Sequence, residues 1–337
     1  MKPLVKTKLI KILQCLAVFA IVIIPLLFAA LKEYRSIHIR YVNLWERERD
    51  AILPGIVCVG DSLTAGADSD FEPYPSLLAE MVKEEICLLP VVNLGHGGEE
   101  SATILAQAGG LPLQIHAFDI PAETVETPVS LYPVDNQPFK LTETETDALL
   151  NPCFVAGVEG YLTRTLDNQF YFERKSAGEP VSVAEGERVI PAAKGKYPSY
   201  LWIIFVGANG GYSSPQNLID QQRKMLETLA EGNDRYLIIT TTGEDAASNR
   251  DVEEACEKEY GEKYLNLREY LSTEAMTDYG ILPTAQDLAD MEAGRNPKSF
   301  RQDGIHYNEL GTRIVAERIY EQLIKLGYFD SLKEFAE

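Results

Sequence analysis

Two short segments of this 337-residue chain carry side chains that could act together in nucleophilic catalysis. Ser62 lies in Gly-Asp-Ser-Leu, and His306 ends Asp-Gly-Ile-His. A serine hydroxyl is a weak nucleophile until an adjacent base removes its proton, and histidine titrates near neutrality. Asp303 precedes His306 by three residues, so a turn could bring its carboxylate to the imidazole and fix the tautomer. The three side chains therefore have the chemistry of a Ser-His-Asp triad.

Two further segments could stabilise the oxyanion that forms when a serine attacks a carbonyl group. Gly98 ends the run Asn-Leu-Gly-His-Gly-Gly, and its missing side chain lets its backbone N–H approach a substrate closely. Asn209 lies in Gly-Ala-Asn, and its neutral amide can donate to a developing alkoxide without adding charge. His96, in the same run as Gly98, is a candidate substrate contact or only a loop residue.

Each segment alone also fits a purely structural role. Gly-Asp-Ser is a common turn composition, so Ser62 could only cap a helix. Asp303 could cap the last helix with His306 on an exposed loop, and Asn209, before two glycines, could only form a turn. The catalytic interpretation therefore requires that the segments meet in one place.

Alternating strand and helix patterns surround these segments. Buried strands are predicted after Gly55 and within 90–98, 199–211 and 235–245, and helices within 74–85, 100–110, 215–232 and 308–327. The apolar stripe of the last helix comprises Leu310, Ile314, Ile319, Leu323 and Ile324. Strands that alternate with helices imply a parallel sheet covered on both faces, and ligands bind at the carboxyl ends of its strands. The candidate residues fall at these ends or just before the last helix.

Residues 111–197 interrupt this alternation, because prolines recur and short strand patterns replace helical periodicity. We interpret the segment as an inserted all-β module whose ends lie close together. Its aromatic residues could stack on sugar rings or fill its own core; they are Tyr161, Phe170, Tyr171 and Phe172.

The N-terminal segment combines four early lysines with an apolar run over residues 12–31. That length can span a membrane as a helix, and Pro25 is tolerated there. We expect an uncleaved signal anchor, with a cleaved signal peptide and secretion as the alternative. The short basic start resembles an export signal, so we expect the large domain outside the cytoplasm, on a helical stalk over residues 32–50.

Composition limits the partners of the folded part. The net charge of −20 argues against nucleic acid as a partner. The five cysteines form neither a metal-binding spacing nor a dense disulfide framework, and the glycine-rich runs lack the spacing and lysine of nucleotide-binding loops. We therefore expect no cofactor and no metal.

Four blocks in order, Gly-Asp-Ser-Leu, Asn-Leu-Gly-His-Gly-Gly, Gly-Ala-Asn and Asp-Gly-Ile-His, resemble those of the SGNH, or GDSL-type, hydrolase superfamily. The resemblance covers residues 55–110 and 199–327. It implies a three-layer, flavodoxin-like α/β fold, with Ser62 as nucleophile, His306 as base and Asp303 as its orienting acid. The backbone N–H of Ser62, with Gly98 and Asn209, would form the oxyanion hole. The chain departs from the family pattern at Gly210, where an aspartate usually follows the asparagine.

The resemblance and the expected location imply a serine esterase that removes acyl groups, most often acetyl, from extracellular or cell-envelope carbohydrate. Two alternatives stay open at this point: a carbohydrate O-acyltransferase, and a wall-facing binding module with a vestigial site. The expected division of the chain is 1–31 for the anchor, 32–50 for the stalk, 51–110 and 198–337 for the hydrolase domain, and 111–197 for the β-rich insertion.

Overall fold

The computed structural model describes residues 24–66, 70–134, 149–165, 167, 169–240 and 246–336, and it divides into two units, Met1–Ile52 and Leu53–Glu337. The described residues of the first unit form the helix α2 (Ile24–Ile52), which includes the predicted stalk. Most of the predicted membrane span lies outside the described residues. Within the described part of the chain, no helix is both long and apolar enough to cross a membrane.

The second unit contains a parallel sheet of five strands. In chain order these are β1 (Ile56–Gly60), β2 (Val91–Gly95), β11 (Leu201–Phe205), β12 (Tyr236–Ile239) and β13 (Tyr264–Leu265). They lie side by side in the order β13-β12-β11-β1-β2. This is the flavodoxin-like order, whose direction of winding changes between the first and third strands. The switch point lies between β1 and β11, which pair in register from Ile56 with Leu201 to Gly60 with Phe205.

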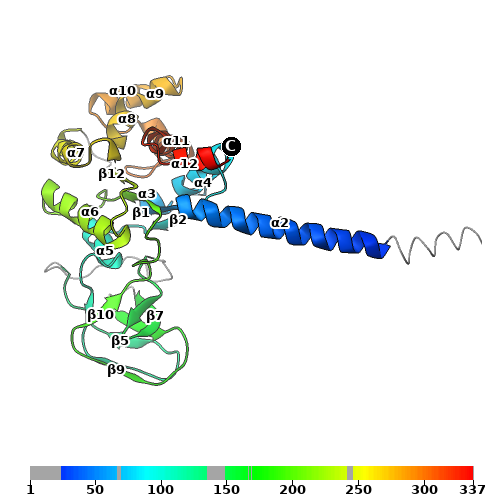
Figure 1. The fold of residues 1–337 in the computed structure, drawn as a ribbon. Coiled ribbons are helices and arrows are strands. Elements are labelled where there is room, and N and C mark those ends of the chain that lie inside the picture. Colours follow the sequence, from blue (N-terminus) through cyan, green and yellow to red (C-terminus); the bar gives the residue numbers. More distant parts are fainter. Residues whose placement is uncertain are drawn as a thin grey trace, which may run out of the picture. The chain divides into compact units, whose positions relative to one another are not determined.

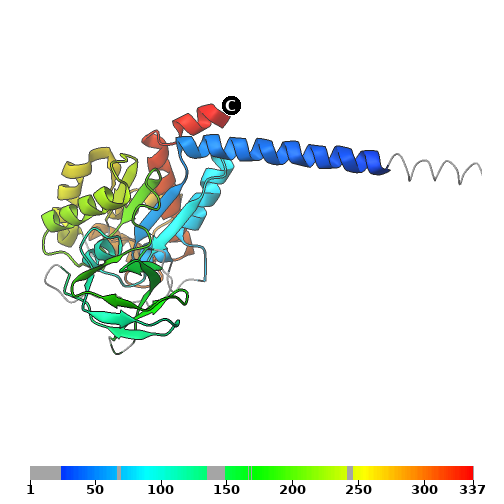
Figure 2. The same cartoon turned by 60° about the horizontal axis from the view of Figure 1, so that its bottom comes forward.

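Helices cover both faces of this sheet (Figures 1 and 2). On one face, Val57 and Trp202 of the sheet share a buried core with α5 (Ser101–Gln107), α6 (Pro215–Leu229) and α7 (Ala246–Tyr260). On the other face lie α4 (Tyr74–Glu85) and α11 (Glu309–Lys325), and the ring of Tyr74 packs 6.1 Å from that of Phe205. The sheet and the helices on its two faces thus form a three-layer α/β arrangement.

The other short helices of the described residues follow β1, flank β13 or lie further along the chain. They are α3 (Ser62–Ala65), η2 (Gly261–Lys263), α8 (Leu267–Thr273), α9 (Ala275–Asp278), α10 (Ala285–Glu292), η3 (Lys298–Phe300) and α12 (Asp330–Ala336). The predicted apolar stripe of α11 is confirmed for Ile314, Ile319 and Leu323, which are buried. The prediction is wrong for Leu310, which lies in the first turn of the helix and is 38% exposed.

Between α5 and β11 the chain forms antiparallel strands, drawn at the bottom of Figure 1. They are β3 (Gln114–Ile115), β4 (Phe118–Ile120), β5 (Thr127–Val129), β6 (Cys153–Val155), β7 (Val158–Arg164), β8 (Phe170–Arg174), β9 (Val181–Val183) and β10 (Glu187–Ile190). Six pair in the order β3-β10-β6-β7-β8-β5, and β4 pairs with β9. Phe172 is 1% exposed and fills the core of this region, so it presents no sugar-stacking face. The division of the chain into a hydrolase domain and an insertion stays a prediction.

Candidate active site

The turn after β1 presents Ser62 at the switch point of the sheet. The strand Ile56–Gly60 is fully buried, and Ser62 is the first residue of the short helix α3. Asp61, not Ser62, is the N-cap of that helix, because its carboxylate accepts from the backbone N–H of Leu63 at 3.0 Å. The serine side chain is therefore not used as a cap.

Close packing around Gly60 fixes where this turn lies. A Cβ on Gly60 would meet Oγ1 of Thr64 at 2.2 Å and the carbonyl oxygen of Phe205 at 2.4 Å. Only glycine lets β1 turn so tightly against β11 and the first turn of α3.

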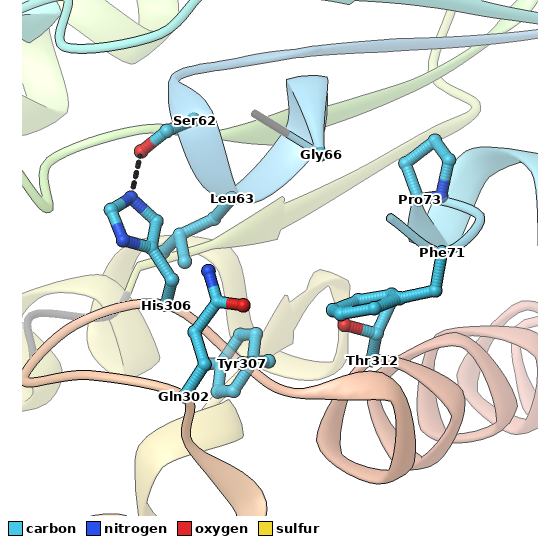
Figure 3. Close-up of a pocket in the computed structure, with 9 residues that line it drawn as sticks. All are labelled: Ser62, Leu63, Gly66, Phe71, Pro73, Gln302, His306, Tyr307 and Thr312. Carbon is cyan, nitrogen blue, oxygen red and sulfur yellow. Dashed lines mark hydrogen bonds between the residues drawn. The ribbon is translucent and has the colours of Figure 1, made fainter. Parts of the chain in front are cut away.

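Ser62, His306 and Asp303 come together although Ser62 and His306 are 244 residues apart in the chain. The Nε2 atom of His306 lies 2.9 Å from Oγ of Ser62 (Figure 3). Its Nδ1 atom lies 2.7 Å from Oδ2 of Asp303. A carboxylate at Nδ1 holds the ring proton there, so that Nε2 is free to accept the serine proton. This is the geometry that general-base activation of a serine requires.

Asp303 is held ionised by three donors. Its Oδ1 accepts from the backbone N–H groups of Ile305 and His306, both at 2.7 Å. Partial burial alone would raise the pKa of this carboxyl, but the hydrogen bonds from the His306 ring and from the two backbone amides lower the pKa to about 2. Asp303 therefore accepts from the imidazole and does not compete for its proton near neutral pH. The alternative helix-cap role is also wrong, because Asn308 caps α11.

Asp61 has the opposite electrostatic environment. Burial raises the pKa of its carboxyl to about 7, although hydrogen bonds from the Leu63 and Ala208 amides and the charge of His306 oppose that shift. Its burial is not predictable from the sequence, because a polar side chain inside a turn gives no signal of its burial.

The loops of the two candidate oxyanion donors are bound to each other. The side-chain amide of Asn209 donates to the carbonyl oxygen of Glu99 at 3.1 Å, next to Gly98. Both the backbone N–H and the hydroxyl of Ser101 donate to the carbonyl oxygen of Gly210, at 3.0 Å and 2.9 Å. These contacts join the loop after β2 to the loop after β11.

The departure from the family pattern at Gly210 has a backbone reason. Gly210 has φ of +74°, and Gly211 has φ of +87°, with its Cα so close to Glu100 that a Cβ would lie 2.6 Å from that residue's Cβ. Side chains are strained in this conformation. The orientation of the Asn209 amide is supported instead by the carbonyl of Glu99.

His96 is buried, with 6% of its surface exposed, and its backbone N–H donates to the carbonyl oxygen of Gly60 at 2.9 Å. Its backbone thus takes part in joining β2 to the turn before Ser62. Contact between its side chain and a substrate stays a prediction.

A small pocket opens beside the hydroxyl of Ser62 (Figure 3). Its lining comprises Ser62, Leu63, Gly66, Phe71, Pro73, Gln302, His306, Tyr307 and Thr312. Several of these residues were not found from the sequence, although Gln302 and Tyr307 flank the Asp-Gly-Ile-His segment directly. Within the described ranges, no group of three or more His, Cys, Asp or Glu side chains is placed to hold a metal ion.

Known proteins resemble this chain in structure. No family model and no curated protein matches the chain. The fold is similar to the crystal structure of a member of the lipolytic protein G-D-S-L family from Veillonella parvula DSM 2008, with 14% sequence identity and a TM-score of 0.34. The match covers 79% of this chain and 96% of that chain.

Proposed function

We propose that the protein is a serine hydrolase of the GDSL kind that cleaves carboxylic esters. The observation that carries this proposal is the continuous hydrogen-bonded series from Ser62 through His306 to Asp303, at 2.9 Å and 2.7 Å. A buried turn serine with only a structural role would not need an imidazole at its hydroxyl and a carboxylate behind that imidazole.

In the proposed reaction, Ser62 Oγ attacks the ester carbonyl carbon while His306 Nε2 takes the hydroxyl proton. The resulting oxyanion accepts hydrogen bonds from the backbone N–H groups of Ser62 and Gly98 and from the amide of Asn209. His306 then returns the proton to the alkoxide that leaves, and an acyl-enzyme remains. A water molecule, deprotonated by His306, attacks this acyl-enzyme, and Ser62 recovers its proton when the acid departs.

The finer proposal is that the acyl group is short, an acetyl group, and that the alcohol is an extracellular or cell-envelope carbohydrate. Two features support it. The pocket at Ser62 is small and partly walled by Leu63, Phe71 and Pro73. The basic start and the apolar run over residues 12–31 favour a membrane-anchored protein with its catalytic domain outside the cytoplasm.

The test is hydrolysis of p-nitrophenyl acetate, butyrate and octanoate by the full-length chain, beside release of acetate from acetylated xylan and from peptidoglycan. Ser62→Ala is the matched control, since it removes one oxygen atom. We expect turnover that falls to background in Ser62→Ala and that decreases from acetate to octanoate. Equal rates for the two folded proteins would refute the hydrolase proposal.

A fluorophosphonate probe separates the alternatives. Labelling of Ser62 without hydrolysis of any ester would favour the O-acyltransferase, and sugar hydroxyls added as acceptors would then receive the acyl group. Absence of labelling on the folded chain would favour a binding module.

A further inference from the structure

The loop that carries Asp303 and His306 lies at the surface, where side chains are ordinarily mobile. The side chain of Asp303 is 51% exposed and that of His306 is 23% exposed. Within the loop, the backbone N–H of Gln302 donates to the carbonyl oxygen of His306 at 3.0 Å, and Arg301 and Tyr307 form an isolated β-bridge. These few backbone contacts do not by themselves fix the direction of the loop. The residues on either side of the loop, its stems, must therefore be held in place.

The N-terminal stem is held by two buried aspartates one turn apart on α10. Asp287 is 0% exposed and accepts from the backbone N–H of Ser299 at 2.8 Å and from its hydroxyl at 2.7 Å. Asp290 is 2% exposed, and its Oδ2 accepts from Nη2 of Arg301 at 2.9 Å. The contact of Asp287 fixes Ser299, where the loop begins. The contact of Asp290 is charged and holds Arg301, which comes shortly before Asp303 in the chain.

The guanidinium of Arg301 connects the core to the tip itself. Its side chain is 11% exposed, and while Nη2 is bound to Asp290, Nη1 donates to the carbonyl oxygen of Gly304 at 3.4 Å. Gly304 lies between Asp303 and His306 in the chain. A single planar group thus spans from a buried carboxylate to the turn that holds the acid and the base.

Asp290 also binds a second arginine, which can be compared with Arg301. Its other oxygen, Oδ1, accepts from Arg295, at 3.3 Å from both Nε and Nη2, but the side chain of Arg295 is 38% exposed. A charge pair with an exposed partner contributes little, whereas loss of a partner in a buried pair is costly. The two arginines on one carboxylate therefore have unequal expected effects.

We propose that Asp290, acting through Arg301, is a positioning residue that holds the loop of Asp303 and His306 in register with Ser62. The inference rests on the proposed function for its kinetic consequence, but its structural content is independent of that function. Asp290 is not among the residues that line the described pocket.

Two variants test the contact from its two ends, Asp290→Asn and Arg301→Gln, with Arg295→Gln as the matched control. We expect kcat for p-nitrophenyl acetate to fall about 10- to 100-fold in the first two, because displacement of a catalytic group by about 1 Å has an effect of this order. The KM should stay within about twofold, since substrate contacts are kept. Arg295→Gln should retain the wild-type kcat, and Arg301→Lys should recover part of the loss.

The double variant Asp290→Asn/Arg301→Gln distinguishes one shared contact from two separate defects. If the residues act through each other, the double variant is no slower than the slower single variant. Multiplication of the two losses would overturn the proposal, and so would an unchanged kcat in Asp290→Asn. An equal loss in Arg295→Gln would also overturn it.

Hydrogen exchange supplies a readout that needs no esterase activity. The backbone amides of Ile305 and His306 donate to Asp303, so a loosened loop should exchange them faster in Asp290→Asn but not in Arg295→Gln. Unchanged exchange at these amides would refute the positioning role even if the enzyme proved active. Absence of Ser62-dependent turnover in the wild type, with faster exchange in Asp290→Asn, would refute the proposed function alone. If Asp290→Asn does not fold, kcat and amide exchange are compared between Arg301→Gln, Arg301→Lys and the control Arg295→Gln.

Discussion

Asp61 and Asp303 form the same local hydrogen bond in two different halves of the candidate site. Each carboxylate accepts from the backbone N–H two residues ahead, Leu63 at 3.0 Å and Ile305 at 2.7 Å. Yet burial raises the pKa of Asp61 to about 7, whereas contacts with His306 and backbone amides lower the pKa of Asp303 to about 2. The side chain of Asp303 is 51% exposed, and Asp61 is 0% exposed.

The difference shows that the two halves are positioned by different forces. The Ser62 half is held by the packing of a buried parallel strand and by glycine contacts too close for any side chain. The His306 half is held by polar contacts of a surface loop with the buried carboxylates of α10. Substitutions should therefore affect the serine half through packing and the histidine half through hydrogen bonding.

The largest effect on turnover should come from Asp303→Asn, apart from loss of the nucleophile itself. An asparagine at this position can donate to the imidazole and so favours the wrong tautomer, and we expect kcat to fall about 10⁴-fold. Steady-state hydrolysis of p-nitrophenyl acetate measures it. Asp220→Asn is the matched control, since Asp220 lies on α6 with its side chain also 51% exposed. A loss smaller than tenfold would mean that His306 needs no acid behind it.

A smaller loss is expected for Asn209→Ala. Removal of one oxyanion donor costs about 10²–10³ in kcat. Asn209→Asp keeps the size of the side chain without its N–H donors, so it should be at least as slow as the alanine variant. Wild-type kcat in either variant, with intact near-ultraviolet circular dichroism, would exclude Asn209 from the oxyanion hole.

Packing beneath the histidine loop gives a third prediction. A Cβ on Gly311 would lie 2.1 Å from the carbonyl oxygen of Phe300, so Gly311→Ala must push α11 from the stem of the loop. We expect a loss of about 1–3 kcal/mol in the free energy of unfolding, measured by urea denaturation.

Gly304→Ala is the control for that measurement, because a Cβ there meets no atom within 4 Å. Its unfolding free energy should stay within about 0.5 kcal/mol of the wild type. Equal stability of the two variants would contradict the close approach of α11 to Phe300.

The pH dependence of stability tests the opposite pKa shifts of Asp61 and Asp303 without a measurement of turnover. A carboxyl whose pKa is raised by folding binds more protons in the native state, so Asp61 should lower stability as the pH rises from about 4 to about 7. Asp303, whose pKa is lowered, contributes stability above its ordinary pKa and loses it as the pH falls from about 4 to about 2.

Unfolding curves of Asp61→Asn and Asp303→Asn measured against pH test these signs. Relative to the wild type, Asp61→Asn should gain stability as the pH rises through the first window. Asp303→Asn should become more nearly equal to the wild type as the pH falls through the second. Parallel curves for Asp61→Asn and the wild type would mean that Asp61 is not buried as a carboxylate.

The sequence predicted the elements that carry the site, since their signals are local. The helix predicted over 74–85 is α4 with the same bounds, and the strand before Ser62 ends at Gly60. It did not reveal Asp61 as a buried group or Asp287 and Asp290 as supports of the loop, because an aspartate in a turn or a short helix has the same appearance whether solvent or a guanidinium faces it.

The sequence by itself determined the residue types of the candidate site, their order and the strand ends that present them, because periodicity and turn chemistry are properties of neighbouring residues. Only the tertiary structure decided that His306 Nε2 lies 2.9 Å from Ser62 Oγ. It also decided that the two site aspartates have opposite pKa shifts and that a buried salt bridge supports the loop. These outcomes depend on distance and solvent exclusion between segments far apart in the chain, which no local pattern specifies.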